Sequence, residues 1–194
     1  MLHEALKQAT KPNHDQLEQL MFVNEIMNGS LTLQQYRQIL VTNYLVHKTF
    51  EDYLFDNLSP EIAGRLQIEN RKKLAALEAD LDELGLEPPE LEHTTPQIEK
   101  TDAAILGAMY VLEGATLGGN VIVKRLKVNP QLASHNLNFN YYQAYGENLI
   151  PYWKNFCAVL DEQPAESIDA AVSAAKTTFN YIASVQQQQV EAVN

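Results

Sequence analysis

The sequence is short of the residues that several protein classes require. Its 194 residues include a single cysteine, Cys157, which excludes an internal disulfide framework and fits a reducing compartment. Glycine and proline number only eight each, which argues against a loop-rich or all-β architecture. Lysine and arginine total 14 against 25 acidic residues. The resulting net charge of −11 argues against nucleic acid as a general partner, because binding of phosphates needs a basic face.

Long hydrophobic runs are also lacking. Residues 1–19 are polar and carry charge throughout, unlike a signal peptide. The longest low-charge stretch, Ala103–Leu112, is bounded by Asp102 and Glu113. It is far shorter than the roughly 20 apolar residues that cross a bilayer. We therefore expect a soluble, cytoplasmic protein with no membrane partner.

What is present is the composition of an ordinary globular protein. Hydrophobic residues make up 45% of the chain and charged residues 20%. This length suits one domain with a sizeable core, so we expect a single domain over residues 1–194.

Helical periodicity dominates the first half of the chain. Residues 2–21 form an amphipathic pattern, in which Pro12 either kinks the helix or makes it begin afresh. Thr32 and Gln35 form a capping box that predicts a helix to about residue 54. Ser59 and the proline after it predict another helix to about residue 84, where Gly85 stops it.

The second half follows the same pattern. Thr95 and the proline after it predict the start of a helix that is interrupted near Asp102 and runs to about residue 126. A polar loop at 129–138 and helices at 139–160 and 167–190 complete the chain. No segment alternates long enough to be a strand, so the predicted class is an all-α, single-domain helical bundle.

Three side chains of the first helix share one stripe. Lys7, Lys11 and His14 are separated by four and three residues, and Lys7 lies about 10 Å along the axis from His14. A neutral imidazole can ligate a metal, and the two lysines can neutralise anionic groups beside it. The alternative from spacing alone is a core-edge histidine with two solvated lysines.

A second motif is rich in glycine. Gly107, Gly114 and Gly118 recur at intervals of seven and four residues, so their bare backbones share one helical face. Such a face admits either a neighbouring helix or a flat ligand. The stretch is not a phosphate-binding loop, because it lacks the Lys-Ser/Thr ending.

A third motif, Ala175–Phe179, contains Lys176, which is an isolated basic residue. By itself such a lysine usually keeps a helix soluble. Together, however, the three motifs resemble those of the heme oxygenase family. Residues 6–14 follow the family pattern Leu-Lys-x-Ala-Thr-Lys-x-x-His, residues 114–119 follow Gly-x-x-x-Gly-Gly, and residues 175–179 follow Ala-Lys-Thr-x-Phe. The resemblance extends from about residue 2 to 185.

The resemblance implies an enzyme that uses O2 and external electrons to cleave haem into biliverdin, CO and iron, with haem as both substrate and cofactor. His14 is then the ligand of the haem iron. Basic residues near the haem propionates would be Lys7, Lys11 and Lys176. On the opposite side, the resemblance assigns Gly114, Gly118 and Asn120 to catalysis and Gly118 and Gly119 to haem binding.

Two positions depart from the family pattern. Ala115 stands where the mammalian enzymes have an aspartate that organises water for proton delivery. Backbone groups, water, or side chains such as Asn120, Thr116 and Tyr110 would have to replace it. The residue after Phe179 is Asn180, so no arginine contact is expected there.

The electrons must come from outside, because the sequence has no flavin or nicotinamide motif. A ferredoxin or a flavin reductase is the expected donor. Lys124, Arg125 and Lys127 form a basic helix end where an acidic donor could dock. Complementing the dipole of that helix is an equally good explanation.

Other readings remain open at this point. Ala115 motivates a haem-binding or tetrapyrrole-binding protein without turnover. A thiaminase-like hydrolase would use Cys157 as nucleophile, but the apolar neighbours of that residue favour an inert thiol. A di-iron bundle needs two Glu-x-x-His motifs, and only Glu90–His93 fits. His47 is expected at a core edge, whereas His3, His93 and His135 look terminal or loop-borne.

Overall fold

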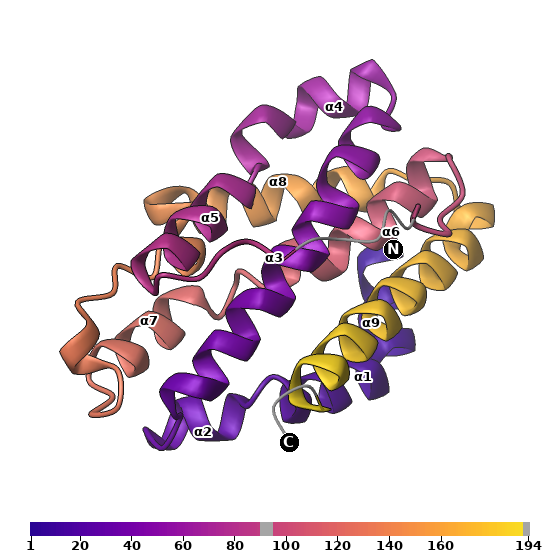
Figure 1. Ribbon diagram of the computed structural model, residues 1–194. Helices are drawn as coiled ribbons and strands as arrows, with labels where there is room; N and C mark the ends of the chain where they lie inside the picture. Colours follow the sequence, from indigo (N-terminus) through magenta and orange to yellow (C-terminus); the bar gives the residue numbers. More distant parts are fainter. Residues whose placement is uncertain (90–94, 192–194) are drawn as a thin grey trace.

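The computed structural model describes residues 1–89 and 95–191, and these ranges contain helices and no strand (Figure 1). The α-helices are α1 Leu2–Leu20, α2 Val23–Asn28, α3 Leu33–Asp56, α4 Pro60–Leu66, α5 Leu74–Glu83, α6 Asp102–Gly114, α7 Gly119–Lys127, α8 Leu149–Asp161 and α9 Ile168–Glu191. Five short 3-10 turns, η1 to η5, lie between them. The all-α prediction is confirmed.

The first helix is continuous despite Pro12 in its interior. Pro12 cannot donate to the carbonyl of Gln8, but both residues lie on the exposed side, where water can reach that carbonyl. Leu2 and Leu6 are buried on the opposite side and hold the helix to the core. The spacing of the histidine motif is therefore that of one helix.

The capping box of α3 is formed as predicted. The backbone N–H of Gln35 donates to Thr32 Oγ1 over 3.1 Å, and the N–H of Thr32 donates to Gln35 Oε1 over 2.9 Å. These reciprocal bonds satisfy two amide groups that a helix start leaves unpaired. The predicted stop at Gly85 is also correct, since this residue has a φ of +61°.

The predicted helix from residue 59 to 84 is wrong, because the chain breaks it into α4, η1 (Ile68–Arg71) and α5. Gln67 adopts a left-handed conformation with φ 52°. The break turns Arg71 and Lys73 toward the interior, where both are buried. Local propensity favoured a helix here, but the buried bonds of these two cations with Glu113 override it.

Two further helix starts differ from the prediction. No helix begins at Thr95, because α6 starts at Asp102 with Thr101 as its cap. Residues 139–148 form the turns η3 (Tyr141–Gln143) and η4 (Gly146–Asn148) instead of the start of α8. The Asp80 carboxylate explains the first turn, since it accepts the backbone N–H groups of Asn140 and Tyr141 over 2.7 and 2.9 Å. The Glu90–His93 motif lies outside the described residues.

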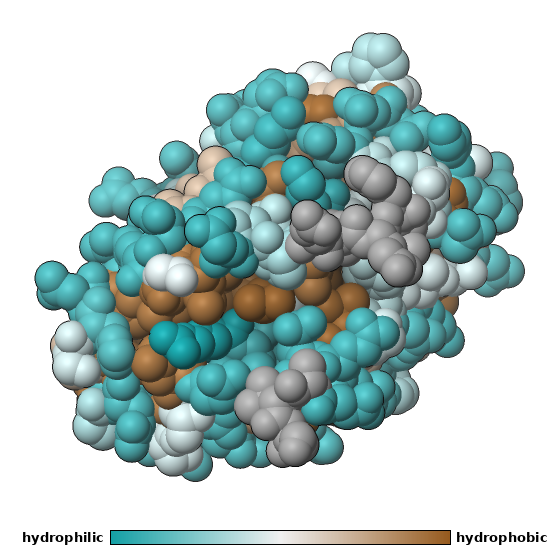
Figure 2. All heavy atoms as spheres, in the orientation of Figure 1, coloured by the Kyte–Doolittle hydropathy of each residue, from teal (hydrophilic) through white to brown (hydrophobic). Residues whose placement is uncertain are grey.

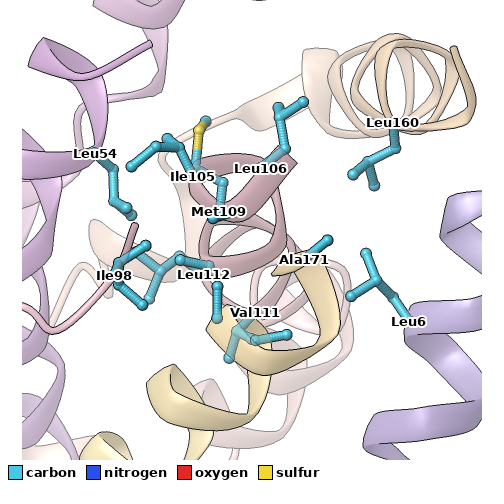
Figure 3. Close-up of a cluster of buried hydrophobic side chains, with 14 of the residues drawn as sticks. Leu6, Leu54, Ile98, Ile105, Leu106, Met109, Val111, Leu112, Leu160 and Ala171 are labelled. Carbon is cyan, nitrogen blue, oxygen red and sulfur yellow. The ribbon is translucent and has the colours of Figure 1, made fainter. Parts of the chain in front are cut away.

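The core is built around α6. Figure 3 shows its side chains facing Leu54 of α3, Leu160 of α8, Leu6 of α1 and Ala171 of α9. The contact with α9 is especially close, because a Cβ at Gly107 would lie 2.1 Å from the carbonyl oxygen of Ala171. Gly107 therefore serves close helix packing, which is one of the two uses that the sequence left open for the glycine face.

The stretch Asp102–Lys127 is apolar and long enough, by those criteria alone, to span a membrane. Residues 103–109 of this stretch are all buried within the protein, against the helices that surround α6. Polar residues cover most of the face seen in Figure 2, with a hydrophobic band across the region where α3 runs in Figure 1.

Candidate functional site

The histidine motif, residues 7–14, lies on the exposed side of α1. The His14 side chain is 59% exposed, and Lys7 and Lys11 are exposed on preceding turns. Within the described residues, the His14 ring forms no hydrogen bond. Its Nδ1 atom lies 3.9 Å from carboxylate oxygens of both Asp15 and Glu18. This imidazole is accessible and has a nitrogen available for a ligand, which fits an axial ligand of haem iron.

Helix α9 brings the third motif beside the first. The rings of His14 and Phe179 meet edge to face with centroids 6.4 Å apart. Asn13 precedes His14 and Asn180 follows Phe179, and the Asn13 Nδ2 group donates to Asn180 Oδ1 over 3.3 Å. Lys176 is exposed on the preceding turn of α9. The fold therefore places the late motif next to His14.

The glycine segment, Gly114–Gly119, connects α6 to α7. Its turn is held by bonds from the N–H of Leu117 to the carbonyl of Gly114 (3.1 Å) and from the N–H of Gly119 to the carbonyl of Thr116 (2.8 Å). A Cβ at Gly114 or Gly118 would meet only ordinary contacts, at 3.9 and 3.4 Å. Both positions are open in the sense that neither backbone is in tight contact with another element.

Gly119 has a different environment. A Cβ at this position would lie 2.4 Å from the carbonyl oxygen of Tyr142, and Gly119 itself is buried. The absence of a side chain here is explained by close packing of α7 on η3. The structure thus divides the predicted glycine set into two open positions, Gly114 and Gly118, and two packing positions, Gly107 and Gly119.

The candidates for replacing the missing acid at Ala115 lie in two places. Thr116 and Asn120 line a small cavity together with residues from 141 to 149. The Thr116 hydroxyl donates to the carbonyl of Glu113 over 2.7 Å, whereas Asn120 is exposed. Tyr110 packs instead on Trp153 and His3, with ring centroids 5.9 and 6.0 Å away. The structure therefore groups Asn120 with Thr116 and separates Tyr110 from them.

The histidine motif and the glycine segment lie on different elements. Helix α2 packs against both α1 and α7, and α9 packs against both α1 and α6. These two helices thus set the relative positions of His14 and the open glycines.

A buried ion cluster, formed by Arg71, Lys73 and Glu113, adjoins the glycine segment and was missed by the sequence reasoning. The three side chains are 0%, 2% and 3% exposed. Lys73 Nζ donates to Glu113 Oε1 over 2.8 Å, and Arg71 Nη1 donates to Glu113 Oε2. Burial raises the pKa of the Glu113 carboxyl, but the charges of Lys73 and Arg71 outweigh it and hold the pKa below its ordinary value.

A sequence signal for this cluster existed. Glu113 directly follows ten residues without a charge, and Arg71-Lys72-Lys73 concentrates three of the 14 basic residues. An acid that ends an apolar helix needs a buried cation as partner. Spacing could not say which cations would supply it.

His47 extends the buried polar region. The sequence placed it at a core edge, but its side chain is only 2% exposed, so this prediction is wrong. Its Nδ1 lies 3.0 Å from Glu51 Oε2, and its Nε2 has no hydrogen-bond partner in the described residues. Burial lowers the pKa of His47 and outweighs the hydrogen bond to Glu51, which acts in the opposite direction. A neutral His47 donates from Nδ1 to Glu51 and has a lone pair on Nε2. The residue also lines a small cavity.

That cavity is lined by His47, the buried ion cluster and parts of α3 and α6, and it has room for about one water molecule. The cavity beside Thr116 is of similar size. Neither is lined by His14, and neither would admit haem.

Cys157 is half-buried, and burial raises the pKa of its thiol to about 11. The thiolate required of a nucleophile is scarce at neutral pH under these conditions, which agrees with the inert thiol favoured by the sequence.

The basic residues Lys124, Arg125 and Lys127 are exposed on the last turn of α7.

Comparisons with known proteins agree with the arrangement of these motifs. The family model described as heme oxygenase matches residues 1–188. A heme oxygenase from Xanthomonas campestris pv. campestris (strain 8004) is 30% identical over 153 residues, covering 78% of this chain and 88% of the relative.

Two solved structures share the fold. The NO- and CO-bound heme oxygenase of Neisseria meningitidis superposes with a TM-score of 0.76 at 21% identity, covering 98% of this chain and 92% of the other. The heme oxygenase-1 of the cyanobacterium Synechocystis sp. PCC6803, in complex with heme, gives a TM-score of 0.74 at 17% identity, with 99% and 95% covered. With the family match over nearly its whole length, this chain belongs to the heme oxygenase family and is an enzyme that degrades haem.

Proposed function

We propose that this chain holds haem through His14 as the iron ligand while the ring is cleaved to biliverdin, CO and iron. The observation that carries this proposal is the exposed His14 ring, which lies beside Phe179 and has no hydrogen bond within the described residues. Haem is the substrate, and its iron supplies the redox chemistry with O2 and external electrons. The protein supplies binding, orientation and control of protons.

Two carboxylates support the role of His14. Asp15 and Glu18 each place an oxygen 3.9 Å from Nδ1. A small rotation of the ring or a bridging water completes a hydrogen bond from Nδ1–H. This bond would leave Nε2 as the coordinating atom and make it more basic.

The exposed lysines fit the propionates. Lys7 and Lys11 lie on the same helix as His14, and Lys176 lies on α9 near Phe179. Lys11 pairs with Asp15 at 2.6 Å, but both side chains are more than half exposed. Such a surface pair is weak, so Lys11 can exchange Asp15 for a propionate at little cost.

The open glycines fit the opposite face of a flat ring. Gly114 and Gly118 let the backbone approach haem, and Gly119 keeps the segment against η3. Asn120 and the neighbouring Thr116 hydroxyl can hold water beside the segment, as the aspartate missing at Ala115 would. We assign Asn120 this water-holding role in proton delivery.

The basic end of α7 fits an acidic electron donor. Lys124, Arg125 and Lys127 are exposed together, which is notable in a chain of net charge −11. A ferredoxin or a flavin reductase could dock there by charge complementarity. We further propose that the chain acts as one domain in the cytoplasm, where its single cysteine stays reduced.

A haem titration of wild type against His14→Ala tests the proposal. Loss of a residue that only supports a metal ligand weakens metal binding by roughly 10- to 100-fold. We expect His14→Ala, which removes the ligand itself, to weaken haem binding by more than this. Its Soret band should also change. His135→Ala, which removes another exposed histidine, should bind haem as wild type does. An unchanged spectrum and affinity in His14→Ala would disprove the assignment.

A further inference from the structure

The glycine segment is anchored at both ends and at the buried Thr116 between them. At one end Gly119 packs directly on the Tyr142 carbonyl. At the other end α6 finishes at Gly114, and the preceding residue, Glu113, is buried. Ala115 and Leu117 between them are exposed, so their side chains contribute little to holding the segment.

Glu113 is tied to the segment through its backbone as well as to the core through its side chain. Its carbonyl accepts the Thr116 hydroxyl over 2.7 Å and the Thr116 N–H over 3.2 Å. Its carboxylate accepts bonds from Arg71, from Lys73 and from the Tyr145 hydroxyl, the last over 2.6 Å. Glu113 therefore links the start of the turn directly to the buried ion cluster.

The partners of Glu113 are themselves anchored on other helices. Arg71 Nε donates to the carbonyl of Leu66 at the end of α4 over 2.7 Å, and Nη2 donates to the carbonyl of Tyr152 on α8 over 3.0 Å. The backbone N–H of Lys73 donates to Glu51 of α3 over 2.8 Å. Bonds to charged groups are among the strongest in proteins, and a buried carboxylate cannot exchange them for water.

We propose that Glu113, held by Arg71 and Lys73, is a positioning residue that sets the path of the glycine segment over haem and thereby the carbon at which the ring is cleaved. The effect on cleavage rests on the function proposed above. The effect on the segment itself does not, and can be measured without haem. Glu113 acts through Gly114 and Thr116 and need not touch the substrate.

Amide hydrogen exchange of the haem-free protein tests the first part. Glu113→Gln keeps the shape of the side chain but removes its charge. Leu58→Ala is the control, because Leu58 is buried and adjoins Ser59, whose backbone N–H donates to Asp102 at the opposite end of α6 from Glu113. The exchange rates of Leu117 and Gly119 are measured relative to those of Ala174 and Ala175 on α9.

We expect this ratio to rise at least about tenfold in Glu113→Gln, the change expected when one hydrogen bond to a charged group is lost. It should stay unchanged in Leu58→Ala. An unchanged ratio in Glu113→Gln, or an equal rise in the control, would overturn the proposal. If Glu113→Gln does not fold, Tyr145→Phe replaces it, because this variant removes one donor to the carboxylate. It should give a smaller rise in the ratio, and no rise would overturn the proposal.

The biliverdin isomers formed from haem with a reductant under air test the second part. We expect one isomer from wild type and from Leu58→Ala, and a mixture from Glu113→Gln. A single unchanged isomer from Glu113→Gln would refute the link to cleavage. If wild type itself leaves haem intact, the proposed function fails, while the exchange ratio still decides whether Glu113 positions the segment.

Discussion

The histidine motif and the buried ion cluster use the same residue types in opposite environments. In the first, Lys11 pairs with Asp15 at 70% and 51% exposure, and His14 has no hydrogen-bond partner in the described chain. In the second, Lys73 pairs with Glu113 at 2% and 3% exposure. Exposed charges remain available to a ligand, whereas buried ones are satisfied by each other and fix the backbone.

The largest expected contrast is in stability. Lys73→Met should lower the free energy of unfolding by about 3–5 kcal/mol, because Glu113 and Tyr145 each lose a buried partner. Lys7→Met, the same exchange on the exposed side of α1, should change it by less than about 0.5 kcal/mol. Urea denaturation at pH 7 measures both. Equal losses in the two variants would show that the environments do not differ as described.

A smaller contrast concerns pH. Burial lowers the pKa of His47 below its ordinary 6.5, so the unfolded chain binds a proton at His47 before the folded one does. Stability should therefore fall as pH decreases below about 6.5, with a slope of up to about 1.4 kcal/mol per pH unit from this residue. The Glu51 and Glu113 carboxyls, whose pKa values are held below 4.5, lose their contributions only at lower pH.

Urea denaturation between pH 5 and 7.5 checks this slope. His47→Gln should flatten it, whereas replacing the exposed His135 by glutamine should leave it as in wild type. A slope that persists in His47→Gln would mean that another group is responsible.

The smallest expected effect is on the exposed side. Lys7→Ala and Lys11→Ala should each weaken haem binding by up to about fivefold, since exposed ion pairs contribute little, and salt should reduce the difference further. Haem titration at low and high ionic strength measures this. Lys154→Ala on α8 is the control, because this lysine is exposed but belongs to none of the motifs. An equal loss in the control would argue against contact with the propionates.

Much of the fold could be predicted because its signals are local. The capping box at Thr32, the stop at Gly85 and the periodicity of α1 and α9 all depend on residues a few positions apart. The helix predicted over 59–84 failed for the opposite reason. The sequence Arg71-Lys72-Lys73 is typical of a solvent-exposed basic run. Contacts with Glu51 and Glu113, which the sequence does not show, turn Arg71 and Lys73 toward the interior.

The candidate site divides in the same way. The sequence predicted the members of the histidine motif and the late motif, and α9 brings Phe179 beside His14 as that reading requires. It could not separate open glycines from packing glycines. The space that a side chain would need at Gly107 and Gly119 is filled by the carbonyls of Ala171 and Tyr142. Both carbonyls belong to other elements of the chain.

The sequence by itself determined the all-α class, most helix positions and the family to which the chain belongs, because periodicity, caps and motif spacing are properties of neighbouring residues. The tertiary structure alone decided which charges are buried and which glycines are open. Desolvation and close contact depend on neighbours in space, and the side-chain partners of Glu113 come from two other segments of the chain, residues 71–73 and Tyr145.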